Sequence, residues 1–115
     1  MSKVKRKLTT ILATDCVGFS KRMDENEELT LENLKACRSI IDPQIKEFGG
    51  RIFYTAGDSV IAEFESPVEC VNAAIGFQKA INDRNNSIPQ ESRLDWRVGI
   101  HLDDVIIEGD NVYGN

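Results

Sequence analysis

The feature that most constrains the fold is a hairpin signal in the middle of the chain. Residues 51–56 and 59–64 are two strand-like runs rich in β-branched and aromatic residues. Only Gly57 and Asp58 separate them, and a Gly-Asp pair is typical of a tight turn. The sequence therefore predicts two adjacent antiparallel strands, which need further strands or helices to form a core.

Amphipathic segments flank this hairpin on both sides. Residues 29–48 place apolar side chains at intervals of three and four, and Gly49 with Gly50 supplies a stop signal. Pro43 is expected to bend or interrupt this helix. Residues 66–81 begin with a Ser-Pro pair, which is typical of a helix start, and continue the helical pattern.

The outer segments complete one domain over residues 1–115. We expect a buried strand over 7–14, a polar turn through 24–27, a surface loop over 82–93, a strand pair over 94–102 and 105–107, and a turn over 108–111. Strand, helix, strand, strand, helix, strand, strand is the order of an α+β fold. The predicted architecture is a ferredoxin-like antiparallel sheet with two helices packed on one face.

Charge and composition exclude several function classes. The 115 residues carry a net charge of −5, which argues against a general nucleic-acid binder because such proteins displace counterions with a cationic surface. No apolar stretch approaches the roughly 20 residues that span a bilayer, so no membrane span is expected. Three scattered cysteines, Cys16, Cys37 and Cys70, are typical of reduced thiols in a cytoplasmic protein.

The predicted topology brings two distant acidic residues together. The first two strands run parallel with the third between them, so the end of the first strand lies beside the turn after the second. Asp15 and Asp58 occupy these two places. Two neighbouring carboxylates need a shared cation, and oxygen ligands without histidine or cysteine favour Mg²⁺ or Mn²⁺.

A glycine-containing turn follows the first of these acids. Residues 17–20 (VGFS) lead toward a helical segment, and free amides at a helix start bind anions. Carboxylates, a divalent ion and a phosphate-binding turn together indicate a metal-bridged triphosphate. The simpler alternatives are that Asp15 caps a helix and that Gly57 and Asp58 only form a hairpin turn.

Three segments resemble the class III adenylate and guanylate cyclases. They are Thr10–Ser20 (TILATDCVGFS), residues 49–64 (GGRIFYTAGDSVIAEF) and Arg97–His101 (RVGIH), and the likeness to bacterial members runs from about Lys7 to Asn115. The resemblance implies conversion of a nucleoside triphosphate, with ATP as the first expectation, to a 3′,5′-cyclic nucleotide and pyrophosphate. It also implies two Mg²⁺ or Mn²⁺ ions and a head-to-tail homodimer.

The resemblance assigns roles to particular residues. It implies that Asp15, Asp58 and the backbone carbonyl of Cys16 bind the metal ions, and that Gly18, Phe19 and Ser20 bind phosphate. One ion would lower the barrier to deprotonation of the ribose 3′-hydroxyl. The other would hold the triphosphate and stabilise the leaving pyrophosphate.

Two neutral residues stand where purine-selecting relatives carry charges that read the base. Tyr54 replaces a lysine three residues before the Gly-Asp pair, and Asn111 replaces an aspartate three residues before Gly114. Tyr54 can stack on a base or offer its hydroxyl. We therefore expect these two residues to contact the base with a different selectivity, toward a pyrimidine or with little preference.

The resemblance also implies that the transition-state residues, an asparagine and an arginine on a following helix, lie beyond Asn115. No catalytic residue is expected within residues 1–115, and this chain alone is expected to be inactive because transition-state charge stabilisation is a large catalytic contribution. The rival interpretation is a noncatalytic module of cyclase fold that binds nucleotide or dimerises in signalling. A diguanylate-cyclase-like domain is a third option, but its glycine-rich acidic turn is absent.

The remaining chemistry-bearing side chains have structural explanations. His101, the single histidine, is expected to be a strand residue without a catalytic role, because metal-assisted chemistry needs no imidazole base. Trp96 and Phe77 are expected in the core, together with Cys37 and Cys70.

Overall fold

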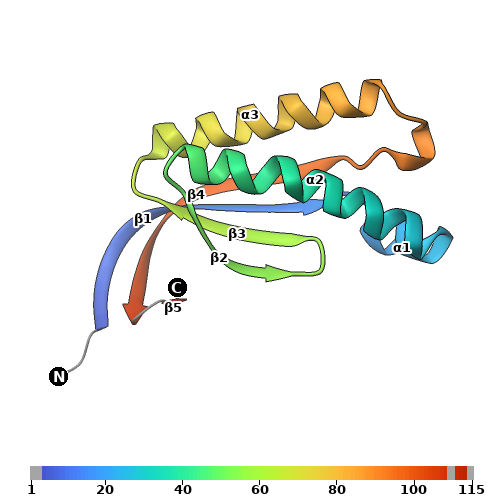
Figure 1. The fold of residues 1–115 in the computed structure, drawn as a ribbon. Helices are drawn as coiled ribbons and strands as arrows, with labels where there is room; N and C mark the ends of the chain where they lie inside the picture. Colours follow the sequence, from blue (N-terminus) through green and yellow to red (C-terminus); the bar gives the residue numbers. More distant parts are fainter. Residues whose placement is uncertain (1–3, 109–110, 114–115) are drawn as a thin grey trace.

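The computed structural model describes residues 4–108 and 111–113, and it has helices packed on one face of an antiparallel sheet (Figure 1). In chain order the elements are β1 (Val4–Cys16), α1 (Phe19–Glu25), α2 (Glu27–Glu47), β2 (Arg51–Ala56), β3 (Ser59–Phe64), α3 (Pro67–Asn86), the 3-10 turn η1 (Gln90–Ser92), β4 (Trp96–Glu108) and β5 (Asn111–Tyr113). The predicted α+β class and sheet architecture are confirmed.

The strand order places the end of β1 beside the β2–β3 turn. The sheet runs β2-β3-β1-β4-β5, and every neighbouring pair is antiparallel. β1 and β2 are therefore parallel with β3 between them, as the sequence predicts. Figure 1 shows the end of β1 and the tip of the β2–β3 hairpin on the same side of the molecule, next to α1.

Local signals set the hairpin and the start of α3 as expected. Gly57 has a φ of 57°, in the left-handed region that glycine adopts at little cost. The Ser66 side chain accepts a hydrogen bond from the backbone N–H of Glu69 at 3.2 Å, and Pro67 occupies the first turn of the helix.

α2 continues through Pro43, so the expected interruption is absent. It ends at Glu47, and the chain then turns at Gly49 and Gly50 as predicted. A Cβ at Gly50 would lie 2.5 Å from the ring of Phe64. Glycine is therefore required at Gly50 to let the chain pass close to the core between α2 and β2.

The predicted pair of strands over 94–107 is instead one long strand. β4 pairs with β1 along its whole length, from Cys16 opposite Trp96 to Val4 opposite Glu108. The two aspartates at 103 and 104 do not break it, because Asp104 forms an ion pair with Arg6 across the strands at 3.1 Å. Of the turn expected at 108–111, residues 109 and 110 lie outside the described residues.

Two helical segments exceed the prediction. α1 begins where residues 17–20 were expected to lead into a helix and extends over Asp24 and Glu25 of the expected polar turn, and α3 runs to Asn86 into the predicted loop. Asn85 explains the second difference, because its buried side-chain amide donates to the backbone carbonyl of Leu94 at 3.0 Å. That long-range contact secures the polar last turn of the helix.

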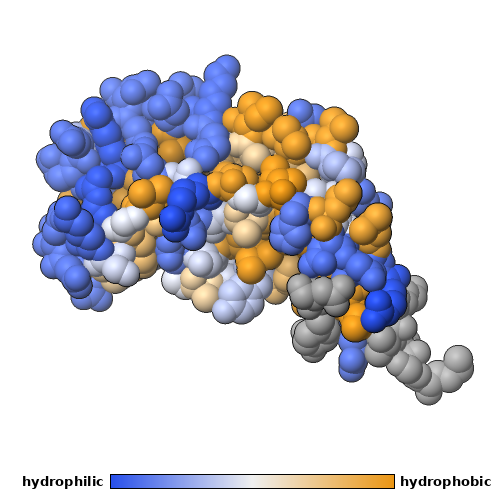
Figure 2. Space-filling model, turned by 180° about the vertical axis from the view of Figure 1, so that it is seen from behind, coloured by the Kyte–Doolittle hydropathy of each residue, from blue (hydrophilic) through white to orange (hydrophobic). Residues whose placement is uncertain are grey.

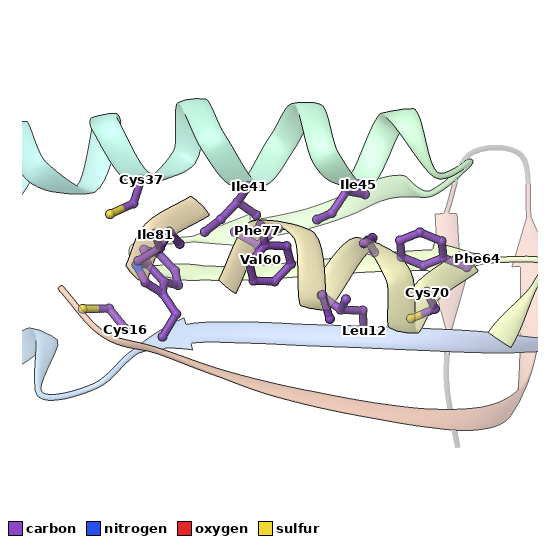
Figure 3. Packing of buried hydrophobic residues seen from close by; sticks show 14 of the residues in the cluster. Leu12, Cys16, Cys37, Ile41, Ile45, Val60, Phe64, Cys70, Phe77 and Ile81 are labelled. Atoms are coloured by element: carbon purple, nitrogen blue, oxygen red, sulfur yellow. The ribbon is translucent and has the colours of Figure 1, made fainter. Parts of the chain in front are cut away.

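The core lies between the sheet and the helices α2 and α3 (Figure 3). Phe77 and Trp96 are both buried, as are Cys37 and Cys70, which confirms the four core assignments. The thiols of Cys16, Cys37 and Cys70 are free. His101 lies in β4 with its side chain 58% exposed, consistent with a strand residue.

Hydrophobic side chains also gather on part of the surface (Figure 2). The exposed large apolar residues on α3, β4 and β1 are Val68, Val71, Ile75, Ile100, Leu102 and Leu8. Contiguous apolar surface of this kind is typically covered by another element or another chain. Among the helices of the described residues, none is long and apolar enough to cross a membrane.

Candidate metal and nucleotide site

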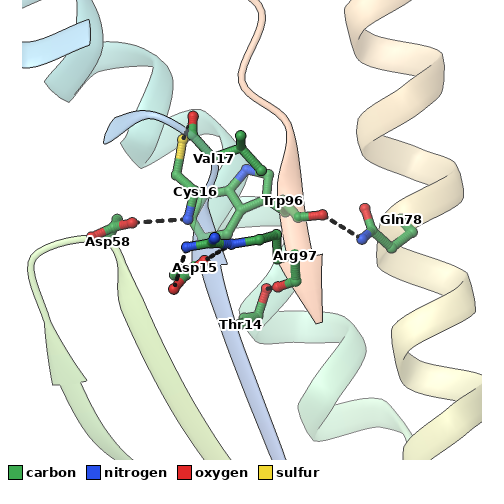
Figure 4. A network of polar contacts seen from close by, with 8 residues as sticks. All are labelled: Thr14, Asp15, Cys16, Val17, Asp58, Gln78, Trp96 and Arg97. Carbon is green, nitrogen blue, oxygen red and sulfur yellow. Dashed lines mark hydrogen bonds and ion pairs between the residues drawn. The ribbon is translucent and has the colours of Figure 1, made fainter. Parts of the chain in front are cut away.

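Asp58 is joined directly to the end of β1. Its Oδ2 accepts a hydrogen bond from the backbone N–H of Cys16 at 2.8 Å (Figure 4). Cys16 follows Asp15, so the contact brings the β2–β3 turn to the residue beside the other predicted metal ligand. The two aspartates, 43 positions apart in sequence numbering, meet at one end of the sheet.

Asp15 is held by an arginine on the neighbouring strand. It lies opposite Arg97 in the β1–β4 ladder. The guanidinium donates from Nε to Asp15 Oδ1 at 2.8 Å and from Nη2 to Oδ2 at 3.1 Å, a two-pronged contact (Figure 4). The side chains of Asp15 and Arg97 remain 38% and 69% exposed, so both are open to an incoming ligand.

Arg97 supplies the positive charge that the acidic pair needs. The pKa of its guanidinium is raised by the hydrogen bonds to Asp15, then by the charge of Asp15, and further by the charge of Asp58. Arg97 therefore contacts Asp15 directly and feels the charge of Asp58 from a greater distance. The expectation that the two acids share a divalent cation stays a prediction.

The donor set fits a divalent ion that completes its shell with water or phosphate. The described residues contain no group of three or more His, Cys, Asp or Glu side chains that could hold a metal. Asp15 and Asp58 offer two carboxylates at one place, and Mg²⁺ is typically bound through one or two carboxylates together with substrate phosphates. The residues present therefore suit Mg²⁺ or Mn²⁺ bound along with a polyphosphate.

The thiol of Cys16 is not arranged as a ligand. Its side chain is 2% exposed and belongs to the core under the helices. Burial, followed by the nearby charge of Asp58, raises the pKa of the Cys16 thiol to about 12. The thiol is therefore neutral at physiological pH, and the assignment of this residue to metal binding concerns its backbone carbonyl and stays a prediction.

The turn after β1 is built for close approach of a ligand. Gly18 adopts a φ of 66° at the start of α1, and nothing lies within 4 Å of the place where a Cβ would stand. The first amides of α1, including those of Phe19 and Ser20, have no partner earlier in the helix. Within the described part of the chain, these first amides of α1 have no helical acceptor, an arrangement that suits phosphate.

Two cavities flank this turn. One, of about 410 Å³, is lined by Val17, Gly18, Lys21, Arg22 and Glu25, together with Gln90 and Glu91 of η1. The other, of about 270 Å³, lies on the uncovered face of the sheet and includes Asp15 and Arg97 in its lining. The second has room for a ligand group beside Asp15, and the first, next to Gly18, presents two cationic and two acidic side chains.

The two residues expected to contact the base lie on different edge strands. Tyr54 is on β2, 52% exposed, and opposite Ile61, which lines the cavity beside Asp15. The backbone of Asn111 is on β5, the other edge strand, and its side chain lies outside the described residues. The structure places Tyr54 on the same face as Asp15, and base contact by either residue stays a prediction.

Arg97 is the site residue that sequence reasoning missed. In the sequence, Arg97 stands out only as the first residue of the RVGIH segment. The available signal was its position: it begins the strand that neighbours β1, so it is opposite the last residues of β1. A cation at that place in an antiparallel pair must lie next to the acidic end of β1.

This arrangement makes a specific prediction for Arg97→Gln. The neutral variant removes the cation that competes for Asp15, so we expect free Mn²⁺ to bind about five- to tenfold more tightly. Triphosphate affinity should fall by a similar factor, because a positive charge near the turn of residues 17–20 is lost. Titration calorimetry measures both, with Lys79→Gln as the charge-matched control on α3. If Arg97→Gln changed the affinities for Mn²⁺ and for the triphosphate by the same factor in the same direction, Arg97 would have no such role.

Comparisons with known proteins agree with this geometry. No family model matches the chain. Putative adenylate cyclase 3 of Rhizobium meliloti is 34% identical over 113 residues, which cover 97% of this chain and 19% of that protein. Serine/threonine-protein kinase pkn2 of Myxococcus xanthus is 30% identical over 114 residues, 98% of this chain and 14% of that protein. The chain thus spans less than a fifth of these curated relatives.

A solved structure shares both fold and sequence. The adenylate/guanylate cyclase/hydrolase from Silicibacter pomeroyi superposes with a TM-score of 0.88 at 33% identity, over 98% of this chain and 66% of that one. The match includes the β1–α1 turn and the β2–β3 hairpin that carry Asp15 and Asp58, because nearly the whole chain is covered. With this fold and this sequence identity, the chain belongs to the class III adenylate/guanylate cyclase family of catalytic domains.

Proposed function

We propose that the chain forms the metal- and triphosphate-binding part of a nucleotide cyclase site. The parent reaction converts a nucleoside triphosphate, ATP in the first instance, to a 3′,5′-cyclic nucleotide and pyrophosphate. The observation that carries the proposal is the hydrogen bond from the N–H of Cys16 to Asp58, which fixes the second acid beside Asp15. Membership of the cyclase family supports the type of reaction that we propose.

Each residue of the site has a defined task in this proposal. Asp15 and Asp58, with the carbonyl of Cys16, would hold two divalent ions. These ions, when bound, favour deprotonation of the ribose 3′-hydroxyl and stabilise the charge on the leaving pyrophosphate. The amides from Gly18 to Ser20 bind phosphate oxygens and orient the triphosphate.

The chemistry requires no covalent protein intermediate. The ribose 3′-oxygen loses its proton and attacks the α-phosphorus in line, and the bond from that phosphorus to the pyrophosphate oxygen breaks. Arg97 forms an ion pair with Asp15 in the ligand-free chain. With its planar set of N–H donors, the same guanidinium would also be suited to a phosphate oxygen of a bound triphosphate.

The test is metal-dependent binding of a nonhydrolysable triphosphate. We expect titration calorimetry to detect binding with Mn²⁺ and none with a chelator, and we expect Asp15→Ala to abolish the metal-dependent part. Asp24→Asn, which removes an exposed acid of α1, is the control and should bind like the unaltered chain. Binding that is indifferent to Asp15→Ala would remove the proposed site.

A second candidate function has one observation in its favour. Tyr54 and Asn111 replace charged base-reading residues, as in a cyclase-fold module that binds nucleotide without turning it over. Such a module would bind Mn²⁺–triphosphate through Asp15 yet form no cyclic nucleotide in a full-length protein. Assay of the cyclic product from all four triphosphates separates the two functions. The homodimer also stays a proposal.

The base preference depends on Tyr54 in this account. Its exposed ring on β2 is available to stack on a base of any kind. We expect weak discrimination among the four triphosphates, and Tyr54→Lys should shift their relative affinities toward purines. A strict purine preference that Tyr54→Lys leaves unchanged would contradict the role assigned to this residue.

A further inference from the structure

The backbone that leads into β4 is held by two amide side chains of α3. Gln78 Nε2 donates to the carbonyl of Trp96 at 2.7 Å, and Asn85 Nδ2 donates to the carbonyl of Leu94 at 3.0 Å. Gln78 and Asn85 are seven positions apart, or two helical turns, so they lie on the same face of α3. α3 therefore holds the segment of residues 94–96 through two hydrogen bonds.

The same segment is held from the site side by β1 and the phosphate turn. The backbone N–H of Val17 donates to the carbonyl of Asp95 at 2.8 Å, and the hydroxyl of Thr14 donates to the carbonyl of Arg97 at 2.7 Å. Four consecutive carbonyls, residues 94–97, thus each accept a hydrogen bond from another part of the chain. Figure 4 shows Gln78, Trp96, Thr14 and Arg97 in this network.

This network links α3 both to Asp15 and to the turn of residues 17–20. Arg97 projects from the held segment and forms the two-pronged contact with Asp15. Val17, which bonds to the same segment, precedes Gly18 of the phosphate turn. Two carbonyls of this segment accept a hydrogen bond from α3, and that of Trp96 is the nearer to Arg97. Gln78, which donates to it, therefore has the larger influence on the position of the Arg97 side chain.

We propose that Gln78 is a positioning residue. Its amide fixes the Trp96 carbonyl, and this keeps Arg97 in contact with Asp15 and keeps the segment aligned with the turn at Val17. Its effect on ligand binding rests on the proposed function of the site. Its effect on Arg97 does not, because the ion pair with Asp15 is present without ligand. Gln78 touches neither Asp15 nor Asp58 in the described contacts and acts through the backbone of β4.

A measurement on the ligand-free protein tests this first. In the unaltered chain, the Nε–H of Arg97 should give a slowly exchanging NMR signal, assigned by its loss in Arg97→Gln. Gln78→Met, which keeps the length of the side chain but has no donor, should make that proton exchange faster while the protein stays folded. Gln78→Asn, one methylene shorter, should do the same, and Gln78→Lys, which retains an N–H donor, should partly restore the protection.

Ligand binding provides the second readout. Gln78→Met should weaken Mn²⁺–triphosphate binding roughly three- to tenfold, the effect of one hydrogen bond. Asn72→Met is the matched control, because that amide lies on the same helix and bonds only to Glu69. Unchanged Arg97 exchange in both Gln78→Met and Gln78→Asn overturns the proposal. If the unaltered chain binds no triphosphate, the proposed function fails, and the exchange measurement still decides the role of Gln78.

Discussion

Asp58→Asn is expected to lower the affinity for Mn²⁺–triphosphate by at least about a hundredfold while leaving the fold intact. Removal of even an outer partner of a metal ligand costs 10- to 100-fold in affinity as a rough guide, and loss of a charged ligand should cost more. The asparagine keeps an oxygen that can accept the hydrogen bond from the N–H of Cys16. The hairpin should therefore stay docked, and titration calorimetry should record the loss of binding alone.

Asp58→Ala separates the two roles of this carboxylate. It removes the negative charge and also leaves the backbone N–H of Cys16 without its partner. We expect the same loss of binding together with a fall of about 1–3 kcal/mol in the free energy of unfolding, the cost of an unsatisfied buried donor. Metal-dependent binding that survives in Asp58→Asn and disappears only in Asp58→Ala would assign Asp58 a purely structural role.

Phe77→Ala should lower the free energy of unfolding by about 3–5 kcal/mol. Phe77 is fully buried between α3, the sheet and α2, within the core cluster (Figure 3). The truncation removes apolar burial and leaves a cavity that a close-packed core cannot fill. Urea denaturation measures the change, and it is large for a small domain whose total stability is on the order of 5–15 kcal/mol.

Ile75→Ala is the matched control for this prediction. Ile75 lies two positions away on the same helix, but its side chain is 61% exposed. We expect a change within about 0.5 kcal/mol, as for surface substitutions without special contacts. Equal destabilisation by the two variants would mean that the surface around Ile75 is covered in solution.

The parts of the fold that follow from local chemistry could be predicted from the sequence. The bounds of β2 and β3 follow from Gly57, which tolerates a positive φ at the turn between them. The start of α3 follows from the Ser66 cap and the proline after it. The meeting of Asp15 and Asp58 needed one further step. It followed from the antiparallel placement of β3 between β1 and β2.

The features that were missed depend on contacts between distant residues. The end of α3 depends on Asn85 reaching Leu94, and the continuity of β4 past Asp104 depends on Arg6 across the ladder. The role of Arg97 was missed for the same reason, because its partner is 82 positions earlier in the chain. Local periodicity carries no information about such partners, whereas strand pairing does.

Manganese broadening of amide NMR signals tests the central claim most directly. Mn²⁺ bound between Asp15 and Asp58 should first broaden the amide signals of Cys16, Val17 and Asp58, and leave that of Ile75 on α3 sharp. Asp15→Asn should remove this selective effect. Broadening centred instead on the acidic surface where α1 meets α2, or no selective broadening at all, would contradict a divalent-ion site shared by the two aspartates.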